Sequence, residues 1–515
     1  MKLTSLGHAG FIIETNGLRI LCDPWFNPTY FASWFPFPRN DRVDLSQIAE
    51  ITHLYVSHPH KDHFDRQFLK QNVSKDVTVI LPVYPLPLFE KDLRELGFSK
   101  MVYCKNGERV SIGNGVSATV NNYTASTDGG VGDSCLLLDD GEVRVLHLND
   151  AHPEDASALL EDGPIDLVML QYSGASWYPV VYDLPEEEKV ALCKLKRSNQ
   201  TQRAFRYIQQ LAPKFIVPCA GPACFLDDEL FHLNDLDDDP NSVFPDQKFF
   251  LEFLQQNQID GGYLMLPGSS GTLESGKFDV SHELSDTEIT EIFDNKREYL
   301  RLYQESRLSE IEDLRNSWGN STIDLLPALR EWWVPLLKKA NKICAGVDGN
   351  VVLDVGNEQI VIDFISRKVR TWAGEPWKYY FSIDRTMIET CIKERYENWP
   401  AELFLSLRMK VQREGKYDEC VYGFFRCLSP ERIEYFEKHY REYTGLQEMC
   451  SINGHKFERF CPHMKVDLQN YGSIQGDILT CRRHGWEFDL TTGECLTSKN
   501  YSLQVEPQTK AQAES

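Results

Sequence analysis

The chain has 515 residues, of which 42% are hydrophobic, 12% aromatic and 25% charged. This composition excludes a disordered chain, because enough apolar side chains are present to form cores, and the length predicts several domains. The 54 basic and 77 acidic residues give a formal net charge of −23. Such a charge repels a phosphate backbone, so nucleic acid is not expected as a partner.

Fourteen cysteines are too few and too irregularly spaced for a disulfide scaffold, and this pattern is typical of a reducing compartment. The first residues contain no long apolar segment, and no stretch reaches the ~18 apolar residues of a membrane span. We therefore expect a cytoplasmic protein without a membrane span.

Residues 1–265 alternate short strands with turns and a few helices, which predicts an α/β unit. The turn pair Asn16-Gly17 joins strands at 10–13 and 18–22 into a hairpin. Helices are expected near 86–97 and 186–211. Further strands are expected at 77–81, 116–120, 134–138, 143–146 and 167–170.

A Gly- and Ser-rich segment at 267–271 indicates a domain edge. Ser285 and Glu288 then fit a capping box, which predicts a long charged helix that reaches about Trp318. Beyond the first domain we expect four units in chain order: a helical connector at 266–335, an α+β domain at 336–445, an all-β domain at 446–505 and a disordered tail at 506–515.

The densest group of metal-capable side chains is His58-x-His60-x-Asp62-His63, which directly follows an apolar run at 51–56. A loop at the edge of a rigid sheet can hold such side chains in a fixed arrangement. Imidazoles and a carboxylate suit zinc or non-haem iron, and two histidines with one carboxylate form the ligand set of oxygen-activating iron. The motif therefore predicts a metal site.

This motif resembles the H-x-H-x-D-H signature of the metallo-β-lactamase superfamily, and the resemblance covers about residues 1–265. Segments 7–11 and 21–25 resemble the opening strands of the lactonase-like branch, and Asp150 matches its bridging aspartate. The resemblance implies an αββα sandwich with one or two metal ions. It assigns one metal to His58 and His60, the other to Asp62 and His63, and Asp150 to both.

Two histidines of the superfamily pattern are absent. No histidine lies between His63 and His147, and we expect Asp128 or Asp133 in that place. No histidine follows the strand near 216 either. His152 either compensates as a ligand or supports Asp150 from behind. We interpret His8 and Asp23 as structural residues that form hydrogen bonds at strand ends.

A second group consists of Cys461-x-His463 and, after 17 residues, Cys481-x-x-His484. Two cysteines and two histidines can hold a [2Fe-2S] cluster, with the cysteines on one iron and the histidines on the other. A four-ligand zinc site uses the same residue types. The flanking segments 460–468 and 481–495 resemble a Rieske domain of the oxygenase-associated type, which favours the cluster.

A Rieske domain joined to a metallo-β-lactamase-like domain resembles the CMP-N-acetylneuraminate hydroxylase family, with the domain order reversed. The resemblance implies an O2-dependent monooxygenase, with a reductase, ferredoxin or cytochrome b5 as electron donor. Electrons would pass through the cluster to non-haem iron, and a small anionic sugar-nucleotide-like or other biosynthetic molecule would be the substrate. A homo-oligomer could bring a neighbour's cluster to the site. The expected catalytic residues are His58, His60, Asp62, His63 and Asp150.

Two alternatives remain open. In the first, the protein is a metal-dependent hydrolase or lactonase that uses zinc to activate water, and its Rieske domain is regulatory. In the second, it is a non-catalytic electron-transfer or redox-sensing protein.

Overall fold

The computed structural model describes residues 1–174, 177–236, 242–319, 323–440, 448–462, 466–482, 485–497 and 501–506. Two predicted cluster ligands, His463 and His484, lie outside the described residues, as does all of the predicted tail except its first residue. Within the described ranges, no helix combines the length and the apolar character needed to cross a membrane.

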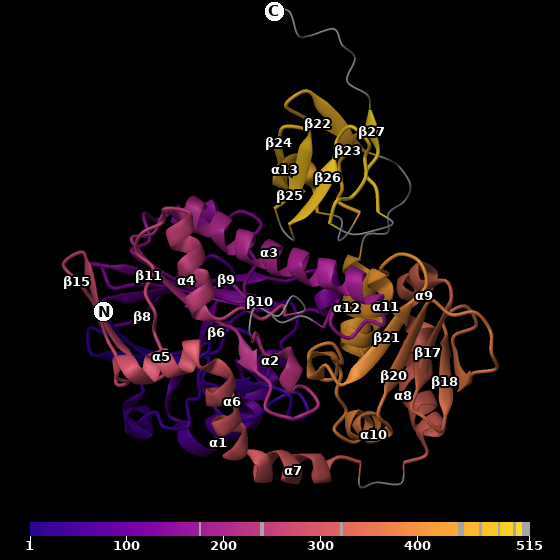
Figure 1. Cartoon of the computed structure of the whole chain (residues 1–515), viewed down its shortest axis with the longest axis horizontal. Coiled ribbons are helices and arrows are strands. Elements are labelled where there is room, and N and C mark those ends of the chain that lie inside the picture. The colour runs from indigo at the N-terminus through magenta and orange to yellow at the C-terminus, as the bar shows by residue number, and fades with distance from the viewer. Residues whose placement is uncertain are drawn as a thin grey trace, which may run out of the picture.

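Two sheets face each other in the N-terminal half (Figure 1). The first has the order β16-β15-β1-β2-β3-β5-β6-β7, and its strands are β1 Lys2–Gly7, β2 Gly10–Thr15, β3 Leu18–Cys22, β5 His53–Tyr55, β6 Thr78–Pro82, β7 Lys100–Cys104, β15 Ser270–Glu274 and β16 Lys277–Ser281. The second has the order β13-β12-β11-β10-β9-β8, and its strands are β8 Arg109–Gly113, β9 Val116–Tyr123, β10 Asp133–Asp139, β11 Arg144–Asn149, β12 Leu167–Gln171 and β13 Phe215–Cys219.

Helices cover the outer faces of both sheets. Helices α1 (Arg66–Asn72) and α2 (Leu88–Glu95) pack on the first sheet, and α3 (Glu186–Leu211) and α4 (Gln247–Gln256) pack on the second. The alternating apolar side chains of the strands fill the layer between the sheets, as the period of two requires. This is the expected αββα sandwich.

The sandwich extends beyond residue 265, where we placed its end. Strand β15 pairs with β1, and β16 pairs with β15, so the first sheet continues to Ser281. The backbone hydrogen bonds of the hairpin β15–β16 thus complete one edge of the first sheet.

The capping box at Ser285 and Glu288 is confirmed, but the single long helix after it is wrong. The segment forms α5 (Asp286–Asp294), α6 (Lys296–Glu305) and α7 (Leu308–Ser317), with breaks at Asn295 and Arg307. The three short helices place apolar side chains such as Ile292 and Leu300 in one core. The free energy gained by burying this apolar surface therefore exceeds the free energy that one unbroken helix would gain from its local sequence.

The central domain has a five-stranded sheet in the order β19-β18-β17-β20-β21. Its strands are β17 Asn350–Asp354, β18 Gln359–Asp363, β19 Lys368–Thr371, β20 Tyr379–Ile383 and β21 Met409–Arg413, and its helices are α8 Leu325–Lys339, α9 Asn341–Val347, α10 Arg385–Lys393, α11 Glu419–Arg426 and α12 Pro430–His439. Its core includes Trp333 and Trp399 and continues into Trp25 and Trp34 of the first domain. The two domains therefore share one hydrophobic core.

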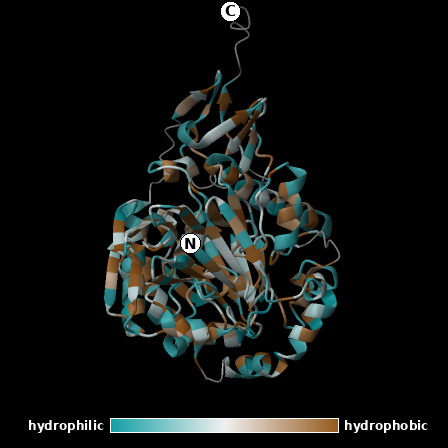
Figure 2. Ribbon diagram, turned by 90° about the vertical axis from the view of Figure 1, so that its left-hand side faces the viewer, coloured by the Kyte–Doolittle hydropathy of each residue, from teal (hydrophilic) through white to brown (hydrophobic). Residues whose placement is uncertain are grey.

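The C-terminal domain has its own small core and two three-stranded sheets. Its elements are β22 Met449–Ile452, β23 His455–Glu458, α13 Leu468–Tyr471, β24 Gly472–Gln475, β25 Ile478–Cys481, β26 Trp486–Asp489 and β27 Val505–Glu506. It stands above the rest of the molecule, next to α3 (Figures 1 and 2). Arg206 Nη2 donates a hydrogen bond to the Arg482 carbonyl (3.3 Å), and the Tyr501 hydroxyl donates one to the Tyr417 carbonyl (2.8 Å).

Candidate metal centre

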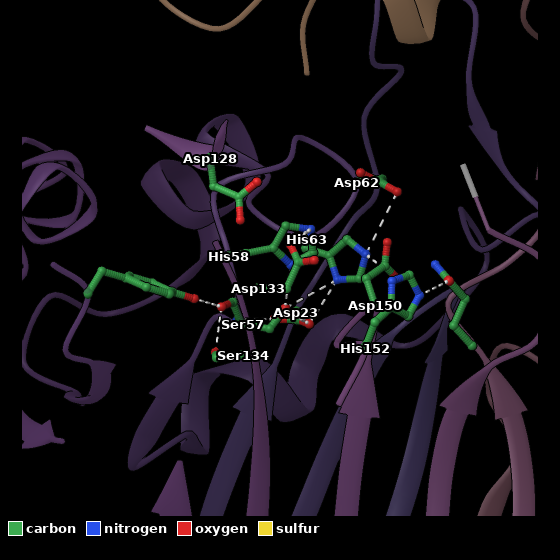
Figure 3. A network of polar contacts seen from close by, with 12 residues as sticks. Asp23, Ser57, His58, Asp62, His63, Asp128, Asp133, Ser134, Asp150 and His152 are labelled. Atoms are coloured by element: carbon green, nitrogen blue, oxygen red, sulfur yellow. Dashed lines mark hydrogen bonds and ion pairs between the residues drawn. The ribbon is translucent and has the colours of Figure 1, made fainter. Parts of the chain in front are cut away.

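The predicted metal residues meet at one edge of the sandwich. The loop with the histidine motif follows β5, which runs parallel to β3 and β6. Asp150 directly follows β11, and Asp133 begins β10, which is antiparallel to β11 and so starts at the same edge. Figure 3 shows these side chains clustered above the strand ends.

Within the part of the chain that the structure describes, three overlapping groups of side chains could each hold a metal ion. They are His58 with His60 and Asp133, His58 with His63 and Asp150, and His8 with Asp62 and His63. Within each group the ligand atoms lie within 4.8 Å of one another. The structure therefore brings the four motif residues together with Asp150 and, of the two candidate substitutes for the missing histidine, with Asp133.

The donor atoms fit a metal ion because several are buried and have no hydrogen-bond partner among the described residues. These atoms are His58 Nε2, His63 Nε2 and Asp150 Oδ1. His63 Nε2 lies 3.4 Å from Asp150 Oδ1, and His58 Nε2 lies 3.9 Å from Asp133 Oδ1. Buried polar atoms are rarely left unpaired in proteins, and a cation among these nitrogen and oxygen atoms satisfies them together.

Asp23 and Ser57 orient the histidines from behind. Asp23 Oδ2 lies 2.9 Å from His63 Nδ1, and Ser57 Oγ lies 2.9 Å from His58 Nδ1. Ser57 itself donates to Asp23 through its amide (2.7 Å) and its hydroxyl (2.6 Å). Because both Nδ1 atoms are occupied, both Nε2 atoms face the site. The expected structural role of Asp23 thus takes the form of a support for the candidate metal ligands.

Asp62 is held by two residues that the motif did not reveal. The Tyr30 hydroxyl donates to Asp62 Oδ1 (2.5 Å), and His8 Nε2 lies 3.1 Å from Asp62 Oδ2. His8, which we interpreted as structural, therefore lies inside the metal-capable region. No sequence pattern points to Tyr30, because it comes from a loop far from the motif in sequence.

Asp128 is placed differently from Asp133. Its carboxylate pairs with Arg426 of α11 (3.2 Å) and accepts a hydrogen bond from the Ala125 amide (2.6 Å). Among the described residues it joins none of the three metal-capable groups. Asp128 instead connects the sandwich to the central domain.

His152 lies behind Asp150, with its Nε2 3.2 Å from Gln171 Oε1.

The electrostatics of the site favour neutral imidazoles at the first pair of histidines. Burial lowers the pKa of His60 to about 4 and holds the pKa of His58 well below its usual value. Neutral histidine is the form that binds metals. Burial and the neighbouring Asp150 carboxylate raise the pKa of Asp133 to about 7. A cation near Asp133 would reverse that shift, because it stabilises the carboxylate.

The two predicted cysteine ligands of the cluster are both buried in the C-terminal core. Cys481 ends β25, and its carbonyl accepts from the Gly485 amide (2.9 Å). The Cys461 amide donates to the Val466 carbonyl (2.9 Å). These backbone hydrogen bonds hold Cys461 and Cys481 in place.

Comparison with known proteins assigns families to all three domains. A beta-lactamase superfamily domain matches residues 2–220, an Rv3818-like, SCP2-like domain matches 325–442, and a Rieske [2Fe-2S] domain matches 453–505. A protein of Mycobacterium tuberculosis named as a Rieske 2Fe-2S iron-sulfur protein is 40% identical over 512 residues, which cover 98% of this chain and 99% of the relative.

Two more distant similarities concern part of the chain. A human protein named as an inactive cytidine monophosphate-N-acetylneuraminic acid hydroxylase is 23% identical over 231 residues, or 43% of this chain and 45% of the human protein. A solved structure of a possible metal-dependent hydrolase from Veillonella parvula is 13% identical, with a TM-score of 0.40, and covers 53% of this chain and 99% of its own.

The fold and the two sites define a protein that joins a metallo-β-lactamase-like domain to a Rieske [2Fe-2S] domain. The chain belongs to the family of the mycobacterial Rieske 2Fe-2S iron-sulfur protein, since the identity extends over nearly the whole of both chains. The predicted fold class and the two predicted cofactors, a [2Fe-2S] cluster and a non-haem metal, are confirmed at this level.

Proposed function

We propose that the protein is an O2-dependent non-haem iron monooxygenase of the Rieske type. An external reductase, ferredoxin or cytochrome b5 supplies electrons, which pass through the [2Fe-2S] cluster to iron in the metallo-β-lactamase-like domain. The substrate is a small molecule. Iron bound by histidines and a carboxylate supplies the chemistry of dioxygen activation.

The observation that carries this proposal is that one helix, α3, contacts residues next to each of the two sites. Arg206 on α3 donates to the carbonyl of Arg482, the residue after Cys481. One helical turn earlier, Arg203 Nη2 donates to Gln171 Oε1 (3.2 Å), and the same oxygen contacts His152. A one-electron carrier placed against this helix suits a redox-active metal, whereas a hydrolytic zinc has no use for electrons.

The protein side chains at the site have separable roles in this proposal. His58, His60 and Asp133 hold a metal, and His63 with Asp150 forms the adjoining group. Asp23 keeps the histidine rings in place. The human relative is named as a hydroxylase, although an inactive one, and that name agrees with the proposed reaction class.

Metal analysis together with oxygen uptake tests the proposal. The purified protein should contain at least about three irons per chain, about two in the cluster and one or more at the histidine site. Reductant-dependent O2 uptake should fall to background in His60→Ala and in Cys461→Ser. The control is His439→Ala, an exposed histidine at the end of α12, which should retain the uptake of the unchanged protein.

Two other results would each favour an alternative. If the chain holds two irons with zinc at the histidine site, and hydrolysis of a lactone survives Cys461→Ser, the protein is a hydrolase. If the cluster is present while the histidine site binds no metal, the protein is an electron carrier or a redox sensor.

A further inference from the structure

One face of α3 carries two cations with no counter-ion among the described residues. Lys196 and Arg203 are seven positions apart, which is close to two helical turns, so they lie on the same side of the helix. Gln200 lies between them on this face and is buried, with its side-chain amide donating to the Gly174 carbonyl (3.0 Å). The face is therefore directed toward the protein and away from bulk solvent.

Arg203 is almost completely enclosed, since only 9% of the residue is exposed. Its one hydrogen bond to a described residue goes to the neutral Gln171, and its Nε is buried without a partner in the described structure. Burial is the main effect on its pKa, which is lowered, and the Asp150 carboxylate acts on it only as a neighbouring charge. A guanidinium buried with unused donors is costly unless an anion accepts them.

Lys196 lies on the same face of the helix and is partly exposed. Its ammonium group makes neither a hydrogen bond nor an ion pair with the residues that the structure describes. Burial and repulsion from Arg203 lower the pKa of Lys196 to about 8. Arg203 is the enclosed cation of the two, and Lys196 adds a second positive charge on the same face of the helix.

Arg203 lies close to the candidate metal centre. Gln171, which accepts from Arg203, also contacts His152, and His152 is two residues from Asp150. We infer that Lys196 and Arg203 bind an oxyanion group of the substrate, either a carboxylate or a phosphate, next to the metal. This inference rests on the proposed function, in which the metal centre is where substrate reacts.

Binding of simple anions to the purified holoprotein tests the inference without turnover. Isothermal titration at pH 7 with inorganic phosphate, and separately with succinate, should detect binding of at least one. Lys196→Gln should weaken that binding at least ten-fold, because it removes the charge and keeps the polar side chain. Lys194→Gln is the matched control, since Lys194 is exposed on the same helix, and it should bind as the unchanged protein does.

Phosphate binding without succinate binding assigns a phosphate group, and the reverse assigns a carboxylate. A lack of binding by both anions would overturn the inference, as would equal binding by the unchanged protein and Lys196→Gln. A labelling experiment avoids the variants: pyridoxal 5′-phosphate with borohydride should modify Lys196, and phosphate or succinate should protect it but not Lys194. Labelling of Lys196 that neither anion slows would also overturn the inference.

The two proposals can fail separately. Anion binding that depends on Lys196, with no reductant-dependent O2 uptake, would reject the oxygenase and keep the anion site. Normal O2 uptake without anion binding would reject the anion site alone.

Discussion

At the scale of single residues, the site depends on side chains that hold the candidate metal ligands without being candidate ligands themselves. Asp23 accepts from Ser57 and contacts His63 Nδ1, and Ser57 in turn contacts His58 Nδ1. One buried carboxylate thus fixes two imidazole rings. Partners of this kind set the ring orientation and the basicity of a ligand.

We expect Asp23→Asn to lower the metal affinity of the histidine site by ~10–100-fold, because the amide cannot accept from both partners as the carboxylate does. Competition with a chelator, followed by iron analysis, measures the effect. The cluster content, read from its visible absorption, should not change. A metal affinity equal to that of the unchanged protein would show that Asp23 serves stability alone.

Lys196 gives a prediction about pH. Its pKa is about 8 in the folded chain against about 10.4 when unfolded, so the charged amine destabilises the fold below about pH 8. The cost disappears as the pH rises from about 8 toward about 10.4. Lys196→Met should therefore raise the free energy of unfolding at pH 7, by ~1–3 kcal/mol, and the gain should shrink at pH 10.

Urea unfolding of Lys196→Met at the two pH values, beside Lys194→Met, measures this difference. A gain of equal size in both variants, or one that grows with pH, would contradict the buried charge.

Much of the metal site could be predicted from the sequence, because His58, His60, Asp62 and His63 stand within six residues on one loop. The spacing itself brings them together. Tyr30 could not be predicted, since it reaches Asp62 only through the packing of a remote segment. Of the two candidate aspartates, Asp133 rather than Asp128 lies with the histidines, and spacing alone does not separate residues five positions apart.

At the scale of elements, the central domain contacts the loop that carries the histidine motif. Lys61, within the histidine motif, pairs with Glu402 (2.5 Å) and donates to the Tyr396 hydroxyl (3.2 Å). Arg426 of α11 pairs with Asp128 on the other side. Both contacts tie loops of the sandwich to the SCP2-like domain, so the geometry of the metal loop depends on that domain.

The ion pair between Arg408 and Asp227 tests how firmly the two domains are joined. Both side chains are buried, at 4% and 2% exposure, and lie 2.9 Å apart. Arg408→Met leaves Asp227 without its buried partner and should cost ~3–5 kcal/mol of unfolding free energy, measured by urea titration. Arg315 contacts the same aspartate at 3.1 Å but is 44% exposed, so Arg315→Met should cost less than ~1 kcal/mol. Equal losses would refute this account.

Individual strands and helices were easier to predict than their limits and their partners. The helix expected at 186–211 is α3 with the same bounds. The residues after Ser285 contain only local signals for a long helix, and the breaks at Asn295 and Arg307 arise from the core against which the segment packs. Tertiary burial of this kind does not appear in a local pattern.

At the scale of the whole molecule, the C-terminal domain contacts both other domains. Arg206 of the sandwich reaches the Arg482 carbonyl, and Tyr501 reaches the Tyr417 carbonyl next to α11. These contacts place the cysteine-bearing sheet against α3 of its own chain. We therefore predict an electron route within one chain rather than delivery from a neighbouring subunit.

We expect no restored activity when Cys461→Ser and His60→Ala proteins are mixed, because each chain lacks one of its own two centres. O2 uptake by the mixture should equal the sum of the two separate variants. Stopped-flow reoxidation of the reduced cluster in His60→Ala provides a second measure, and it should be slower than in the unchanged protein. Uptake that rises when the two variants are mixed would show that clusters serve neighbouring chains.

Gln171 has a consequence for the proton on His152. Gln171 Oε1 accepts a hydrogen bond from Arg203, and a guanidinium can only donate. Exchanging the oxygen and nitrogen of the Gln171 amide would therefore place an NH2 group against the Arg203 donor. His152 Nε2 contacts the same oxygen and must therefore carry the hydrogen, which leaves the ring lone pair of the neutral form on Nδ1. A guanidinium on α3 thus selects the tautomer of a histidine two residues away from Asp150.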